Sequence, residues 1–423
     1  MKLTRTSLTI AAIGLTSFAA LTAGQGCSSS SGSPATENPD SGKPGTDSGK
    51  PSTDSGKPGT DSGKPGTDSG KPGKDSGSDK TDAGRPPQPT GSPTTSTTKH
   101  NFAVHNLYFG DTLPTPAFTP PPTGGTPPWE TFGYNIDGLI TTATSTDVCT
   151  PYMGMTQAQV DGKNGIDNAF GSVLFPSLQE LSSTIGSQSL SGDVAAGKFT
   201  LMFDTVGLST TQPQTAINLT GSLFAGSTYG ATPPLTGTSF SITDDWPVNG
   251  SLLVNPTDIT SGSKILFGNS YITNGTWVSG QQTGSSAGSI VLALSIMGYN
   301  LNLTINDPVV TMPVSVDGSG QFHATEGFVS GVIETSQLVA SLNGILAGIG
   351  LCSAEGDAIQ ILDEAQDILI ASDGTVSNTA GTACNGISIG LAFDADEIAQ
   401  PDMIAPVADA GGVTPPTCGD AGM

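Results

Sequence analysis

Positively charged side chains are scarce in this sequence. Its 423 residues include only 14 Lys and Arg but 37 Asp and Glu, so the formal net charge at pH 7 is −23. A protein that binds nucleic acid by neutralising phosphates needs clustered Lys and Arg, and docking on an anionic membrane surface needs them too. The composition therefore argues against both of these binding modes.

Beyond residue 99 the basic residues almost disappear. Only Lys163, Lys198 and Lys264 remain, against 28 acidic residues, and there is no arginine. The folded part thus lacks the guanidinium fork that usually binds phosphate or carboxylate substrates. Nucleotide and phosphosugar chemistry are disfavoured for this reason.

Long apolar runs are also lacking, because no stretch after the N-terminus reaches the ~18 apolar residues of a membrane helix. The N-terminus itself has Lys2 and Arg5 ahead of an apolar run over residues 8–21. This pattern is typical of a secretory signal peptide, which we place at residues 1–26.

The end of this segment carries a cysteine that follows a small residue. Cys27 comes directly after Gly26 and precedes a run of serines, while Gly24 stands where leucine is usual. The arrangement resembles the lipobox of bacterial lipoproteins. The resemblance implies that Cys27 is the lipidated first residue of the mature chain and that this lipid is the link to the membrane. The expected location is the bacterial cell envelope, at the outer membrane or cell surface. A plain secretory signal cleaved nearby is the alternative.

Residues 27–99 are of low complexity. Asp recurs every seven residues from Asp40 to Asp82, in units of Asp-Ser-Gly-Lys-Pro-Gly-Thr that decay along the segment. A coiled coil would need apolar residues at two positions of each heptad, and here Gly and Pro occur instead. The segment is predicted to be a disordered tether.

The folded domain is predicted to span residues 100–398. Short runs of alternating apolar and polar residues, such as Phe199–Asp204, are separated by Gly-, Asn- and Asp-rich turns. This pattern predicts a mainly β fold, an antiparallel β-sandwich or barrel-like domain. About three accessory helices are expected, over residues 167–185, 338–349 and 358–369. The tail from 399 to 423 is expected to fray.

Four cysteines besides Cys27 suggest two disulfides in an exported chain. They are Cys149, Cys352, Cys384 and Cys418. Cys352 and Cys384 bracket the third helical stretch, so this pair is the favoured bridge. A structural zinc site is disfavoured, since there is no C-x-x-C motif.

The histidines are few, and their spacing is unfavourable for a joint metal site. His100 and His105 are five residues apart, which places them on opposite faces of a regular strand. They and His323 are expected to be polar residues at strand surfaces. The acidic run 394–397 is interpreted as a solvated strand terminus.

Acidic turns provide the best lead to a ligand. Glycine-rich turns hold Asp137 and, in one short stretch, four further carboxylates and amides: Asp161, Asn164, Asp167 and Asn168. Calcium prefers six to eight oxygen ligands, and glycine lets the backbone curl so that carbonyls can take part. These residues are the candidate calcium site, and calcium is the one cofactor that the sequence suggests. The same residue types are also those that ordinary turns require.

The sequence leaves two functions open. The first is a lipid-anchored surface protein whose acidic β-rich domain has a non-catalytic binding or structural role, toward an extracellular or envelope ligand that the sequence does not identify. The second is a secreted-type hydrolase acting on polysaccharide. Residues 284–288 match G-x-S-x-G, but a strand pattern follows where the hydrolase fold needs a helix. Aromatic residues make up only 6% of the chain, whereas sugar sites usually need exposed rings. Trp129, Trp246 and Trp277 would have to line one groove.

Overall fold

The computed structural model describes residues 85–405 apart from 153–154, 156, 182–184, 230–238, 281, 284–287, 297–298, 349 and 351, and it also describes residue 418. Cys27 and most of the predicted tether lie outside these residues. The described residues belong to one compact unit, Ser76–Met423. None of the helices in this part of the chain is long and apolar enough to cross a membrane.

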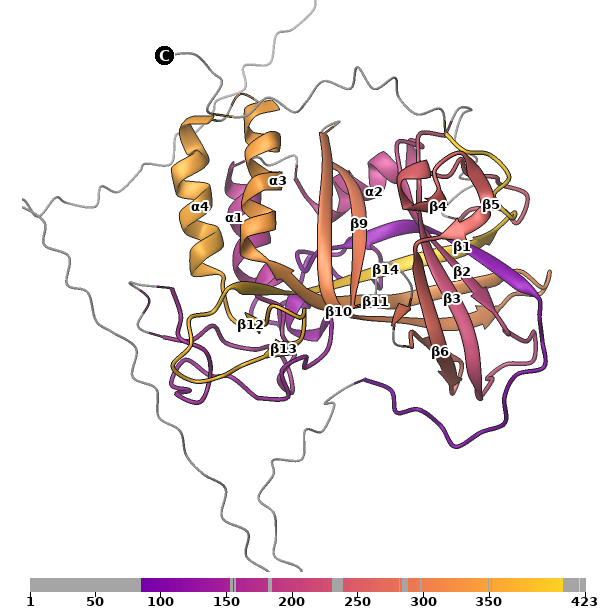
Figure 1. Ribbon diagram of the computed structural model, residues 1–423, viewed down its shortest axis with the longest axis horizontal. Helices are drawn as coiled ribbons and strands as arrows, with labels where there is room; N and C mark the ends of the chain where they lie inside the picture. Colours follow the sequence, from indigo (N-terminus) through magenta and orange to yellow (C-terminus); the bar gives the residue numbers. More distant parts are fainter. Residues whose placement is uncertain are drawn as a thin grey trace, which may run out of the picture. The chain divides into compact units, whose positions relative to one another are not determined.

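The prediction of a mainly β fold is confirmed. Within the described ranges, ten strands form one antiparallel sheet (Figure 1). They are β1 (Lys99–Tyr108), β2 (Thr200–Val206), β3 (Ala216–Gly226), β6 (Ile265–Thr273), β7 (Thr276–Val278), β8 (Gln282–Thr283), β9 (Ser289–Ile296), β10 (Tyr299–Val316), β11 (Phe322–Glu334) and β14 (Gly386–Ile398). Two smaller sheets pair β4 (Leu253–Asn255) with β5 (Asp258–Ser263) and β12 (Leu369–Ile370) with β13 (Val376–Ser377).

The large sheet closes on itself. Its strand order is β11-β14-β1-β2-β3-β6-β7-β10-β9, and β10 also pairs with β11. The closure gives the barrel-like arrangement that the sequence predicted as one of two possibilities. Alternating apolar side chains fill the core, and Phe203 of β2 stacks on Phe393 of β14 with 5.2 Å between ring centroids. Strand β14 pairs with β11 on one side and β1 on the other, and all of its residues are buried.

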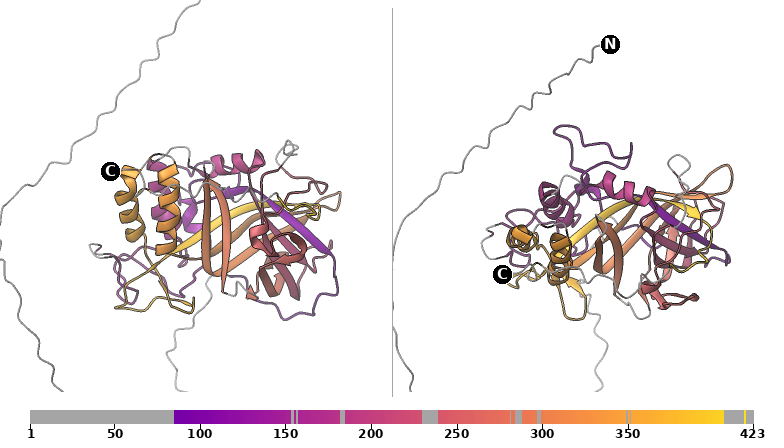
Figure 2. Two further views of the ribbon diagram at one scale, coloured as in Figure 1. Left: turned by 45° about the horizontal axis from the view of Figure 1, so that its top comes forward. Right: turned by 90° about the horizontal axis from the view of Figure 1, so that it is seen from above.

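Four α-helices accompany the sheet in the described part of the chain. They are α1 (Phe175–Leu181), which continues a π-helical turn (Phe170–Leu174), α2 (Ser187–Ala195), α3 (Thr335–Gly348) and α4 (Glu355–Glu364). Three of them correspond to the three predicted helical stretches, whereas α2 was not predicted. Helices α1, α3 and α4 lie together beside the sheet (Figures 1 and 2), and α2 contacts β1.

Both predicted ends of the folded domain need correction. Residues 85–98, assigned to the tether, lie against the sheet: Arg85 donates a hydrogen bond to the carbonyl of Ser279, and the hydroxyl of Tyr271 donates to the carbonyl of Pro86. At the other end, the amide of Ala405 donates to the carbonyl of Val248. The tail is therefore held at least to residue 405.

The predicted Cys352–Cys384 disulfide is wrong. The bridges are Cys149–Cys384 and Cys352–Cys418. A hydrogen bond from the amide of Cys384 to the carbonyl of Thr150, 3.0 Å long, brings Cys384 beside Cys149. The prediction relied on proximity along the chain, whereas this contact joins distant segments.

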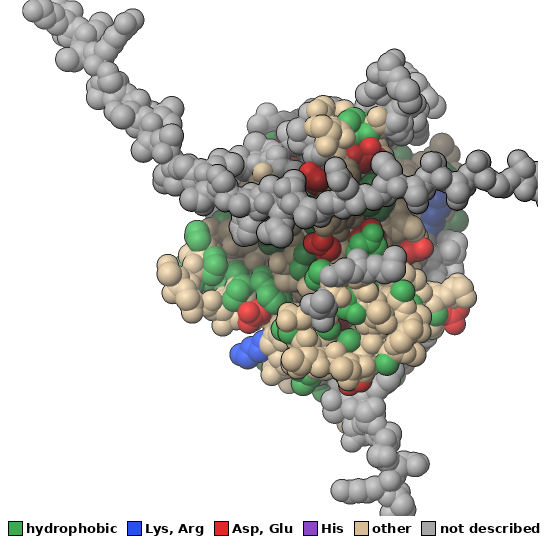
Figure 3. Space-filling model, turned by 90° about the vertical axis from the view of Figure 1, so that its left-hand side faces the viewer, with side chains coloured by type: hydrophobic (Ala, Val, Ile, Leu, Met, Phe, Trp, Pro, Cys, Tyr) green, Lys and Arg blue, Asp and Glu red, His purple; other side chains and the backbone are tan. Residues whose placement is uncertain are grey.

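Basic side chains are rare on the described surface as well as in the sequence. Lys99 pairs with Asp204 at 2.5 Å and Lys198 with Asp193 at 2.6 Å. On the face drawn in Figure 3, Lys and Arg side chains are few while Asp and Glu recur. The surface therefore favours cations over anions.

Candidate functional site

Three acidic residues lie in the buried strand β14. Asp394, Asp396 and Glu397 are only 8%, 2% and 7% exposed. Interpreting residues 394–397 as a solvated terminus was therefore wrong, because strands β1 and β11 cover them on either side. Side chains alternate along a strand, so Asp394 and Asp396 share one face and Glu397 is on the other.

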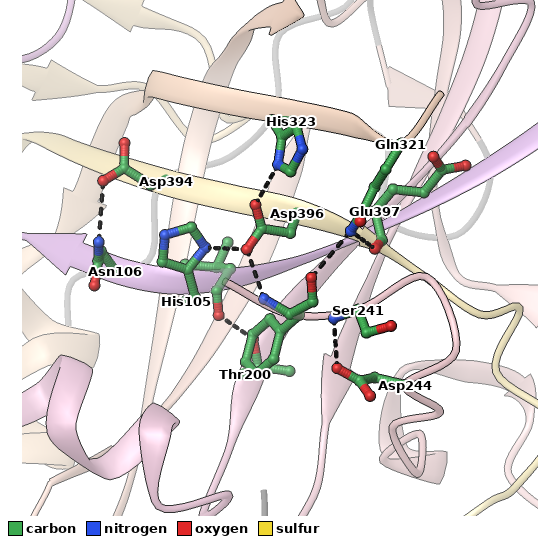
Figure 4. A network of polar contacts seen from close by, with 12 residues as sticks. His105, Asn106, Thr200, Ser241, Asp244, Gln321, His323, Asp394, Asp396 and Glu397 are labelled. Atoms are coloured by element: carbon green, nitrogen blue, oxygen red, sulfur yellow. Dashed lines mark hydrogen bonds and ion pairs between the residues drawn. The ribbon is translucent and has the colours of Figure 1, made fainter. Parts of the chain in front are cut away.

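The three histidines of the chain all contact this acidic run. His100 Nδ1 lies 2.6 Å from Glu397 Oε1. His105 Nδ1 lies 2.8 Å from Asp396 Oδ2, and His323 Nδ1 lies 2.7 Å from Asp396 Oδ1 (Figure 4). His100 and His105 thus contact neighbouring carboxylates on opposite faces, in keeping with their spacing. They are not simple surface residues, since each binds a buried carboxylate.

Asp396 is the centre of this network. Its carboxylate also accepts a hydrogen bond from the amide of Phe240 at 2.8 Å. Burial, the largest effect, would by itself raise the pKa of Asp396. The contact and charge of His105, with the hydrogen bonds from His323 and from the amide of Phe240, together outweigh burial and lower this pKa. For His323, burial acts to lower the pKa, yet the bonds and charges of Asp396 and Asp317 raise it. Asp396 is therefore an anion at neutral pH that orients both rings.

Two β-bulges flank β14 at the same level. In β1, Val104 pairs with Ala395 and Asn106 with Asp394, which leaves His105 as the extra residue. The carbonyl of Val104 is satisfied by the hydroxyl of Thr200 at 2.6 Å. The bulge re-aims His105, which is a common use of bulges beside binding sites.

The second bulge is in β11. Ala324 pairs with Ala395 and Gly327 with Phe393, so that Thr325 and Glu326 face Asp394 alone. Glu326 has a φ of 54°, a left-handed conformation that non-glycine residues rarely adopt. Its amide donates to Asp394 Oδ1 at 3.0 Å, which ties the bulge to the acidic run.

A pocket of about 630 Å³ opens at these bulges. It is lined by His105, Asn106, Ala117, Phe118, Gln188, Ser191, Gly192, Ala195, Thr325 and Asp394. Because Nδ1 of His105 is engaged by Asp396, the other ring nitrogen, Nε2, is the one available to a ligand. In Figure 4 this nitrogen points away from Asp396, toward the side on which Asn106 and Asp394 lie.

The candidate calcium residues are only partly brought together. Asp137, Asp161 and Asp167 lie near one another and near Asp367, as their mutual charge effects show. Asn168 instead donates to the carbonyls of Trp129 and Gly390 and so ties its segment to β14. Asn164 takes a left-handed φ of 60° in its turn, the role expected of an ordinary turn residue.

The clustered carboxylates are already occupied by donors. Asp167 Oδ2 accepts from the amides of Ile136 and Asp137, and Asp161 Oδ2 accepts from the amide of Thr141. Burial, the largest cause, raises the pKa of Asp161 to about 7 and of Asp367 to about 7. Within the described ranges, no group of three or more His, Cys, Asp or Glu is placed to hold a metal ion. Calcium binding therefore remains a prediction.

Calcium binding can be tested by thermal melting. If the turns bind the ion in the folded state only, a hundredfold excess over Kd stabilises by about 2.7 kcal/mol. Asp161→Ala and Asp167→Ala should each abolish the calcium-specific shift. Magnesium at equal concentration is the control, because it is smaller and dehydrates reluctantly. Equal shifts with both ions would identify these loops as turns alone.

The features that favoured a hydrolase receive little support. Trp246 and Trp277 are fully buried, each packed against its own aromatic neighbours, so they do not line an exposed groove. Residues 284–287 of the G-x-S-x-G match lie outside the described residues, and the segment that follows is strand β9. No serine, threonine or cysteine of the described segments hydrogen-bonds to a ring nitrogen of His105.

Sequence reasoning missed the network around β14. The available signal was the run Asp394–Glu397 inside an otherwise apolar closing strand. Finding its partners would have required knowing that β1 and β11 flank this strand. Comparisons with protein-family models, with curated proteins and with solved structures found no match for this chain.

Proposed function

We propose that this chain is a lipid-anchored protein of the bacterial cell envelope that displays its acidic β-rich domain to bind a small ligand. The observation that carries the binding role is the pocket between the two bulges, where His105 and Asp394 meet apolar walls. Strained residues and bulges that converge on one cavity are typical of binding sites.

The anchoring role is supported by the sequence. Cys27 provides the attachment point, and the repeats that follow it provide a spacer that would hold the domain away from the outer membrane or cell surface. This part of the proposal concerns residues that the structure does not describe.

The hydrolase remains the alternative, because a histidine oriented by a buried carboxylate is also a general base. In the described part of the chain this base has no nucleophile bonded to it. Binding without catalysis is therefore the better-supported function.

Anchoring is tested by metabolic labelling with a palmitate analogue. The wild-type chain should be labelled and should sediment with membranes, because the lipid is its proposed anchor. Cys27→Ala should lose both the label and the membrane association. Label that persists in the variant would contradict the anchoring proposal.

Binding is tested by melting the full Cys27→Ala chain against small organic cations, neutral molecules and anions of matched size. At least one class should raise the melting temperature. Gly192→Leu should abolish the shift, since Gly192 lines the pocket and a Cβ there meets no atom within 4 Å. The binding proposal fails if no class shifts the temperature or if every shift survives Gly192→Leu.

A further inference from the structure

The chemistry of the pocket follows from the hydrogen-bonding capacity of two of its polar residues, His105 and Asp394. Nδ1 of His105 lies 2.8 Å from Asp396 Oδ2 as an ion pair, although the contact lacks hydrogen-bond geometry. An ionised carboxylate can only accept, so a proton on Nδ1 is what makes this contact favourable. In the neutral ring, Nε2 then carries a lone pair and accepts a hydrogen bond. A ligand that binds this neutral tautomer through Nε2 must therefore bring a donor.

Asp394, which also lines the pocket, likewise calls for a ligand that donates a hydrogen bond. Its Oδ2 accepts from Asn106 Nδ2 at 3.1 Å and from the hydroxyl of Tyr108 at 2.8 Å. Among the described residues, Oδ1 accepts only from the amide of Glu326. A carboxylate oxygen can accept two hydrogen bonds, so Oδ1 keeps one acceptor position. The described residues that line the pocket include no Lys or Arg to neutralise this charge.

The apolar wall of the pocket includes Phe118, which has an unusual backbone conformation and lies in a loop that is fixed to β11. Phe118 has a φ of 56°, an outlier for a bulky residue, and its ring lies 5.2 Å from that of Tyr108. The hydroxyl of Thr115 in the same loop donates to the carboxylate of Glu326 at 2.7 Å, which fixes the loop to the bulge of β11. An aromatic face beside a carboxylate attracts organic cations.

We infer that this pocket binds a small organic amine in its ammonium form, with an apolar body against Phe118 and Ala195. The ammonium group donates to Nε2 of His105 and to Oδ1 of Asp394. The net negative charge of the whole chain also favours a positively charged ligand. This inference rests on the proposed binding function and adds the class of ligand.

Benzylamine is the probe, with benzyl alcohol and benzoate as neutral and anionic counterparts of nearly the same shape. Calorimetric titration of the full Cys27→Ala chain at pH 7.5 and low salt should give a Kd for benzylamine at least tenfold lower than for either counterpart. Added salt should weaken amine binding, because exposed charges are screened.

Single substitutions test how much His105 and Asp394 each contribute to benzylamine binding. His105→Asn keeps an amide donor for Asp396 but removes Nε2, and it should weaken benzylamine binding at least tenfold. Asp394→Asn should do the same. His100→Gln is the matched control, because His100 also contacts a β14 carboxylate but on the opposite face, and it should leave Kd unchanged.

Each result decides the inference. Tighter binding of benzoate or benzyl alcohol, abolished by Gly192→Leu, would overturn the amine assignment while leaving the binding function in place. The amine assignment would also be overturned if benzylamine binding survived both His105→Asn and Asp394→Asn. It would equally be overturned if the wild-type pocket did not bind benzylamine. A pocket that binds no class of ligand at all would instead refute the proposed function.

Discussion

Raising the pH from 5 to 8 should destabilise the folded domain markedly. Asp161 and Asp367 have pKa values near 7 in the folded state, mainly because burial disfavours their charged forms. In the unfolded chain they titrate near 4, so between pH 4 and 7 the folded state binds more protons than the unfolded state. The free energy of unfolding therefore falls as pH rises, by roughly 2–4 kcal/mol after allowance for incomplete burial.

Thermal melting between pH 5 and 8 in the presence of a chelator measures this effect. Asp161→Asn should flatten the profile, because an amide keeps the acceptor for Thr141 and can donate permanently to Asp167. The variant should gain stability at pH 8 and little at pH 5. Asp193→Asn, in an exposed ion pair with Lys198, is the control and should keep the wild-type slope. A wild-type profile that is flat or rises with pH would refute the account.

Replacing Asp396 by asparagine should cost roughly 3 kcal/mol or more of unfolding free energy. One carboxylate oxygen serves His323 and the other serves both His105 and the amide of Phe240. An asparagine replaces one of these oxygens by an amide nitrogen, a donor that must face another donor. It also removes the negative charge that lies beside both rings. Urea unfolding at pH 6 measures the loss.

Asp317→Asn is the comparison for this variant. Asp317 lies 3.5 Å from the same histidine, His323, but is exposed to solvent. Surface ion pairs contribute roughly 0–1 kcal/mol, so the loss should be small. Equal losses for the two variants would show that Asp396 is not the centre of the network.

The fold class was predictable because it depends on local pattern. The alternation in Phe199–Asp204 and the turns between short apolar runs are properties of neighbouring residues, and they correctly indicated antiparallel strands. Helical periodicity likewise indicated α3 and α4, although each helix begins three residues before its predicted range. Helix α2 was missed, because its small and polar residues give only a weak apolar stripe.

The site was not predictable from local pattern. His105 and His323 converge on Asp396 only because β1 and β11 flank β14, and each strand carries a bulge that changes its register. Likewise, Cys149 reaches Cys384 through a hydrogen bond between segments far apart in the chain. Spacing along the sequence supports no inference about such pairings, and the strand order comes from the packing of the whole sheet.

The pairing of β1 with β14 has a consequence for the timing of folding. The first strand of the domain and the last one are neighbours, and the contact between His100 and Glu397 spans 297 positions. During synthesis, which proceeds from the N-terminus, one edge of β1 has no partner until β14 has been made. Pairings of such long range close slowly. We therefore expect the pocket, which is lined by His105 of β1 and Asp394 of β14, to form only after β14 has been synthesised.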